Sequence, residues 1–138
     1  MVTQAQAFKI IAILIGLFLI ATGFDKIVHF SDFIRSLGNY WFVPLQWATS
    51  VGVTVILLEL FLGLCLFFTS MRPLASLGAA IMLMLVTGAS LLQKYFMPLS
   101  DCGCWFSVPE PKTIAIHTII NVAIIWSLFQ IHRAFKSS

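Results

Sequence analysis

The sequence predicts an all-α membrane protein, a four-transmembrane-helix bundle with a short interfacial helix in its first outer loop. Of its 138 residues, 60% are hydrophobic and only 9% are charged, whereas soluble domains carry about 25% charged residues. Four apolar stretches approach or exceed the length of about 20 residues that crosses a hydrocarbon core. The chain is too short for a separate soluble module, so residues 1–138 are expected to form one transmembrane domain. The net charge of +3 is spread along the chain without a basic cluster, which gives no indication of nucleic acid as a partner.

The predicted spans cover residues 7–24, 47–69, 74–92 and 113–131. Lys9 lies near the start of the first span and Glu59 lies inside the second, while the third and fourth have no formal charge. Backbone polar groups must pair within the bilayer, so each span is expected to be a helix. No A-x-A-like cleavage site follows the first span, which favours an uncleaved helix over a signal peptide. An even number of spans puts both termini on one side.

The first outer loop is expected to contain a short amphipathic helix. Its apolar residues recur at helical spacing, at Phe30, Phe33, Ile34 and Leu37. Ser31 is the predicted N-cap, and Gly38 is suited to the stop. Such a helix lies on the membrane surface or over the mouth of the bundle.

The positive residues predict the orientation. Lys9, Arg72, Arg133 and Lys136 fall on the side of the termini, and the same number of positive residues on the other side is spread over nearly twice the length. By the positive-inside rule the termini are cytoplasmic. We therefore expect a multi-pass protein of the bacterial inner membrane, with loop 98–112 in the periplasm. Aromatic residues crowd that outer side as an interfacial belt or as the wall of a pocket, namely Tyr40, Trp41, Phe42, Trp47, Tyr95, Phe96, Trp105 and Phe106.

The strongest indication of function is the pair Cys102-Gly103-Cys104 in loop 98–112. A disulfide between residues i and i+2 closes a very small ring, which Gly103 has the freedom to permit. Strained, exposed disulfides are the labile and catalytic kind, so Cys102 and Cys104 are the predicted catalytic residues. A static disulfide and a Cu(I) site completed by His29 or His117 are the alternatives. Cys65 is expected near the cytoplasmic face as a packing residue.

Several polar residues in or near the spans are candidates for cofactor binding. Glu59 is an intramembrane carboxylate, either functional or paired with Lys26 or another polar residue. His117 and Asn121 are four apart and share one helical face, where they could bind a quinone or form an interhelical hydrogen bond. Asp25 and Lys26 could pair at the interface or lie beside the thiols. The candidate cofactor-binding residues are His117, Asn121, Trp105 and Glu59; no metal ligands are assigned.

Three segments resemble the MauE branch of the DoxX-like membrane proteins over nearly the whole chain. They are Gly23-Phe24-Asp25-Lys26, Glu59-Leu60-Phe61-Leu62-Gly63 and Asp101-Cys102-Gly103-Cys104-Trp105-Phe106. Members of that branch often have the sequence D-C-G-C-F-G. In this chain Trp105-Phe106 replaces the Phe-Gly that follows the second cysteine. The resemblance implies a four-helix membrane bundle tied to periplasmic thiol–disulfide chemistry and to the maturation of methylamine dehydrogenase, with a thioredoxin-like partner.

These observations predict an integral membrane thiol–disulfide oxidoreductase. One of the two outer cysteines forms a mixed disulfide with a cysteine-containing periplasmic partner and the other resolves it. Electrons pass to or from a quinone in the bilayer. The alternatives are a non-catalytic subunit or scaffold of a larger membrane redox or maturation complex, and a Cu(I)-handling membrane protein.

Overall fold

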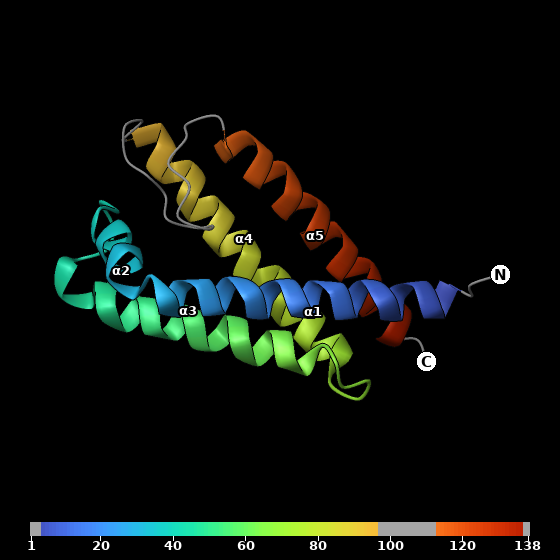
Figure 1. Cartoon of the computed structure of the whole chain (residues 1–138). Coiled ribbons are helices and arrows are strands. Elements are labelled where there is room, and N and C mark those ends of the chain that lie inside the picture. The colour runs from blue at the N-terminus through green and yellow to red at the C-terminus, as the bar shows by residue number, and fades with distance from the viewer. Residues whose placement is uncertain (1–3, 97–112, 137–138) are drawn as a thin grey trace.

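The computed structural model describes residues 4–96 and 113–136, which form five α-helices (Figure 1). These helices are α1 (Gln4–Val28), α2 (Phe30–Gly38), α3 (Leu45–Cys65), α4 (Arg72–Phe96) and α5 (Thr113–Lys136). All but α2 are long and apolar enough to cross a membrane. The predicted all-α class with four membrane helices is therefore confirmed, and the chain is a multi-pass membrane protein.

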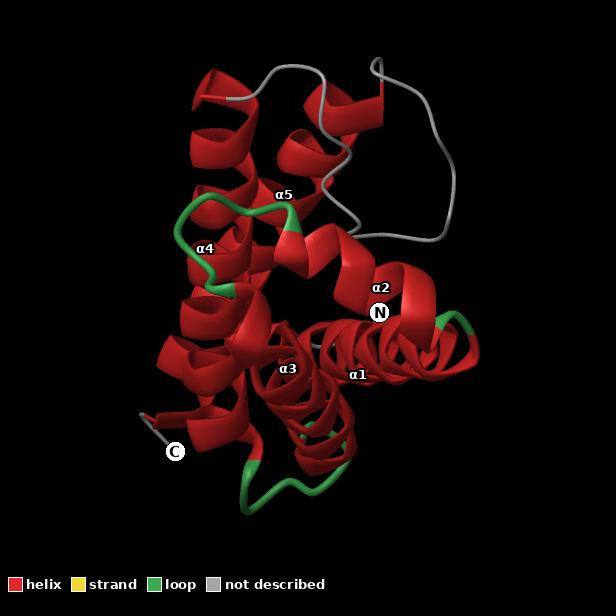
Figure 2. Ribbon diagram, turned by 90° about the vertical axis from the view of Figure 1, so that its left-hand side faces the viewer, coloured by secondary structure: helices red, strands yellow, loops and turns green. Residues whose placement is uncertain are grey.

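The helices pack as two antiparallel pairs, α1 with α3 and α4 with α5, joined by smaller α1–α5 and α3–α4 contacts. Figure 2, which looks nearly along α1 and α3, shows α4 and α5 running across them. Both termini lie at one end of the bundle, here called the terminal end, and α2 lies at the other, here called the α2 end (Figure 1). The shared core lies toward the terminal end and includes Ala12, Ile15, Leu19, Cys65, Leu66, Ala79, Leu128 and Ile131. Cys65 is 7% exposed, as its predicted packing role requires.

The backbones of α1 and α3 touch where two glycines face each other. A Cβ on Gly16 would lie 2.8 Å from the carbonyl oxygen of Gly63, and a Cβ on Gly63 would lie 2.9 Å from that of Gly16. Small residues allow close approach of membrane helices, whose association depends on van der Waals packing. This contact sets the distance between α1 and α3.

Most helix ends differ by a few residues from the predicted spans. α1 continues beyond residue 24 to Val28, and α3 ends at Cys65, short of residue 69. The end of α3 is held by Arg72, whose Nε donates to the Leu66 carbonyl at 3.0 Å and whose Nη2 donates to the Phe67 carbonyl at 3.2 Å. These bonds satisfy carbonyl groups that a helix end leaves without intrahelical partners.

α2 occupies the predicted position, but the predicted N-cap at Ser31 is wrong. The helix begins at Phe30 with His29 as its N-cap and without a side-chain capping bond. The reason is that the backbone ladder barely breaks between α1 and α2, since His29 N donates to Asp25 O and Phe33 N donates to His29 O. α2 packs on α3 at Gly52, where any Cβ would collide with Ile34.

Candidate functional site

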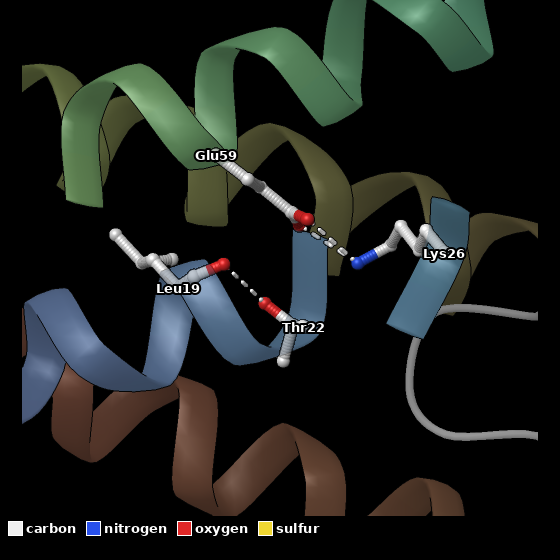
Figure 3. Close-up of polar contacts among 4 residues, drawn as sticks. All are labelled: Leu19, Thr22, Lys26 and Glu59. Atoms are coloured by element: carbon white, nitrogen blue, oxygen red, sulfur yellow. Dashed lines mark hydrogen bonds and ion pairs between the residues drawn. The ribbon is translucent and has the colours of Figure 1, made fainter. Parts of the chain in front are cut away.

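A buried ion pair joins Lys26, in the last turn of α1, to Glu59 of α3 (Figure 3). Lys26 Nζ lies 2.9 Å from Oε1 and 2.8 Å from Oε2 of Glu59. The two side chains are only 7% and 6% exposed. Pairing with Lys26 was one of the predicted alternatives for Glu59, and the structure shows it. The pairing of Asp25 with Lys26, one of the two predicted alternatives for these residues, is not found: the Asp25 carboxylate faces His29, with Oδ1 and Nδ1 3.3 Å apart.

The local sequence explains why the pair forms. Gly23 lies one turn before Lys26 on the same side of α1. A Cβ on Gly23 would lie 3.0 Å from the Leu60 side chain and 3.6 Å from the Cβ of Glu59. The missing side chain lets α1 pass close to α3, so that the lysine reaches the carboxylate. The nearby Thr22 hydroxyl is directed to its own helix, where it donates to the Leu19 carbonyl at 3.0 Å (Figure 3).

The ion pair lines one side of an apolar cavity of about 170 Å³. The other walls come from α2, the α2–α3 loop, α3 and α4. Phe33 of α2 lines the cavity and places its ring centroid 5.7 Å from Lys26 Nζ. Among the residues that line it, Lys26 and Glu59 are the charged ones. A mostly apolar pocket with a few converging polar groups is the usual form of a small-molecule site.

The aromatic residues of the α2 end fall into two groups. Tyr40 and Phe42 line the cavity. Trp41, Trp47 and Tyr95 are 57%, 58% and 83% exposed, as expected of an interfacial belt. The predicted pocket-lining role therefore holds for Tyr40 and Phe42, while the interfacial belt stays a prediction for the exposed residues.

The loop that carries Tyr40 is fastened to the last turns of α4. Gln93 is 1% exposed; its Nε2 donates to the Asn39 carbonyl at 2.8 Å, and its Oε1 accepts from Trp41 N at 3.4 Å. The Tyr40 hydroxyl lies 3.5 Å from Ser90 Oγ. The sequence analysis missed Gln93, although an amide near the end of an apolar helix is a signal for such a fastening.

Residues 4–130 match the family model described as methylamine utilisation protein MauE. The chain belongs to the MauE family. The matched range contains the Lys26–Glu59 pair, every element that lines the cavity and the Cys102-Gly103-Cys104 segment. No curated protein and no solved structure matches the chain.

The structure separates the candidate cofactor residues of this MauE-family protein. Glu59 lines the cavity, whereas His117 and Asn121 lie on α5 and do not line it. Asn121 is 5% exposed and its Nδ2 donates to Thr87 Oγ1 of α4 at 3.0 Å. This is the interhelical hydrogen bond that was one predicted alternative for that face. His117 precedes Asn121 by one turn and is half-buried.

Cys102, Cys104 and Trp105 lie outside the described residues. The helix ends on either side of that segment, Phe96 and Thr113, lie away from the terminal end (Figure 1). Within residues 4–96 and 113–136, no group of three His, Cys, Asp or Glu side chains could hold a metal ion.

Proposed function

We propose that this MauE-family protein exchanges thiols and disulfides with a cysteine-containing protein outside the membrane, through Cys102 and Cys104, in the maturation of another protein. The observation that carries the proposal is the Cys102-Gly103-Cys104 pair inside a chain whose match to the MauE family extends over residues 4–130. The expected partner is a thioredoxin-like periplasmic protein.

The helix arrangement supports an exposed position for this pair. α4 runs away from the terminal end and α5 runs back toward it (Figure 1). The segment between Phe96 and Thr113 therefore joins two spans on the side of the membrane opposite the termini. With the termini in the cytoplasm, as the positive residues indicate, the cysteine pair faces the oxidising side of a bacterial inner membrane, where disulfides persist.

The chemistry needs an electron carrier besides the partner. A thiolate of the pair attacks the partner's disulfide, and the other cysteine resolves the mixed disulfide, which oxidises the pair by two electrons. Cys65 cannot relay these electrons, because it is buried at the end of α3 that lies toward the terminal end. A quinone dissolved in the bilayer exchanges two electrons and two protons as it interconverts with its quinol, so it balances the thiol–disulfide couple in either direction.

The test is the redox state of the thiols in intact cells. Acid trapping followed by a mass-tagged alkylating reagent should show Cys102 and Cys104 in both reduced and oxidised forms. One of the two single variants, Cys102→Ser or Cys104→Ser, should accumulate a disulfide-linked adduct with the partner, because it keeps the attacking thiol and lacks the resolving one. Cys65→Ala is the matched control and should leave the tagging of the pair unchanged.

An unchanged redox state of the partner in the Cys102→Ser/Cys104→Ser double variant would contradict the proposal. If that variant also keeps a maturation complex intact, while loss of the whole chain dissolves it, the protein is a scaffold. A pair found fully reduced, with copper retained after anaerobic purification, would favour the Cu(I) alternative.

A further inference from the structure

We propose that the cavity beside the Lys26–Glu59 pair binds the ring of a lipid-soluble quinone, with the Lys26 ammonium donating a hydrogen bond to a ring oxygen. The inference rests on the proposed function and deepens it, because it assigns a binding site to the electron carrier. The inference depends on three observations: the volume of the cavity, its exposed lining residues on membrane-spanning helices, and the ion pair on one wall.

The volume suits one substituted six-membered ring. The cavity measures about 170 Å³, and an engineered apolar cavity of about 150 Å³ in another protein binds benzene. Aromatic side chains from α2 and the following loop, Phe33, Tyr40 and Phe42, line it. Such walls favour a flat, apolar ring, since stacked and edge-on contacts between rings are attractive.

Part of the cavity wall belongs to residues that are exposed on the membrane-spanning helices. Leu85 of α4 and Val51 of α3 both line it, and they are 70% and 37% exposed. Both residues belong to membrane-spanning helices, so their exposed surfaces face lipid. A ligand that enters the cavity from this lipid-facing side must dissolve in the bilayer. An isoprenoid tail would remain in the lipid while the ring occupies the cavity.

The ion pair supplies a polar contact that an acyl chain would not need. An ammonium group has three N–H donors. The hydrogen bonds recorded for Lys26 within the described part of the chain both go to Glu59. A third donor is therefore available for a carbonyl oxygen of a quinone, and the carboxylate holds the ammonium in place at the cavity wall. Hydrogen bonds from charged donors are stronger than neutral ones.

The test is direct binding of a decyl-chain benzoquinone to the purified full-length protein in detergent, measured by equilibrium dialysis. Three changes probe the site. Ala89→Trp fills the cavity from α4, Lys26→Met/Glu59→Leu replaces the ion pair with apolar side chains, and Ala123→Trp is the control on the exposed surface of α5. The thermal unfolding midpoint of each variant shows whether it is folded.

We expect Ala89→Trp to abolish saturable binding and Ala123→Trp to bind as the unmodified protein does. Lys26→Met/Glu59→Leu should bind at least about tenfold more weakly, since a charged hydrogen bond contributes about 1.5–3 kcal/mol. A folded Ala89→Trp variant that still binds would overturn the assignment of the cavity. Equal binding after loss of the ion pair would show lipid-like partitioning and overturn the role of Lys26.

Two further measurements test the size of the bound ring and distinguish failure of this inference from failure of the proposed function. A short-chain naphthoquinone should bind more weakly than the benzoquinone, and equal or tighter binding would overturn the single-ring assignment. Binding measured in the Cys102→Ser/Cys104→Ser background should be unchanged, because the site contains neither cysteine. If binding is retained while thiol exchange is absent from the unmodified protein, only the proposed function fails. If exchange occurs without saturable quinone binding, only this inference fails.

Discussion

Replacing Lys26, Glu59 or both tests whether the buried ion pair stabilises the fold as its geometry requires. Both side chains are almost fully buried, at 7% and 6% exposure, and the ammonium lies within hydrogen-bonding distance of both carboxylate oxygens. Lys26→Met or Glu59→Leu alone leaves one charge buried without its partner. Breaking a buried pair in this way costs about 3–5 kcal/mol of unfolding free energy.

The double variant Lys26→Met/Glu59→Leu should recover most of that loss. Replacing a buried pair with apolar side chains of similar volume is often neutral or stabilising. We expect the double variant to lie within about 1 kcal/mol of the unmodified protein on this basis, which makes the coupling energy of the cycle at least about 5 kcal/mol. The recovery is also what makes this variant suitable for the quinone-binding test.

The unfolding free energy of each variant is measured by titrating the purified protein in mixed micelles with a denaturing detergent and following its helical circular dichroism. Lys9→Met is the matched control, because Lys9 is an exposed lysine of the same helix, and it should change stability by less than about 0.5 kcal/mol. Single variants that each cost under about 1 kcal/mol, or a double variant that costs the sum of both, would refute the reasoning about a desolvated pair.

Other contacts give further predictions for the same unfolding measurement and for hydrogen exchange. Gly16→Ala should lower the unfolding free energy by about 2–4 kcal/mol, because its Cβ would meet the carbonyl oxygen of Gly63 on the facing helix. The control Gly88→Ala has nothing within 4 Å of its Cβ and should be neutral or stabilising. Equal losses in the two variants would contradict the close contact. Arg72→Met should cost about 2–4 kcal/mol, since two carbonyls at the end of α3 lose a charged donor, and an unchanged stability would rule out that capping role. Gln93→Leu should speed amide exchange across residues 39–43 while the exposed Gln46→Leu does not; equal rates in both would mean that Gln93 does not hold the loop.

The spans and α2 could be predicted because each is specified by its own sequence. Apolar length gives a membrane helix, and the spacing of Phe30, Phe33, Ile34 and Leu37 gives α2 its buried side. The cap at Ser31 was wrong because its prediction treated α2 as an isolated helix, whereas α1 runs almost directly into it. Local patterns do not reveal that kind of continuity.

The site could be predicted only in part, because it depends on which helices become neighbours. Glu59 was identified as unusual, but its pairing with Lys26 joins residues far apart in the sequence and remained one alternative of several. The interhelical hydrogen bond of Asn121 was one predicted alternative, but its partner Thr87 could not be predicted because that contact depends on the packing of α4 against α5. The cavity has no sequence signature of its own, since it arises where α2, α3 and α4 leave a space.

The ion pair also has a consequence for biogenesis. A carboxylate near the centre of a helix raises the cost of its insertion into the bilayer by about 2.5–3.5 kcal/mol, and α3 carries Glu59 well inside its span. Synthesis delivers α1 first, with Lys26 in its last turn, which can remain near the headgroups until a partner arrives. On this reasoning we expect a chain without its first helix to insert α3 less efficiently, because Glu59 would then enter the bilayer without its positive partner.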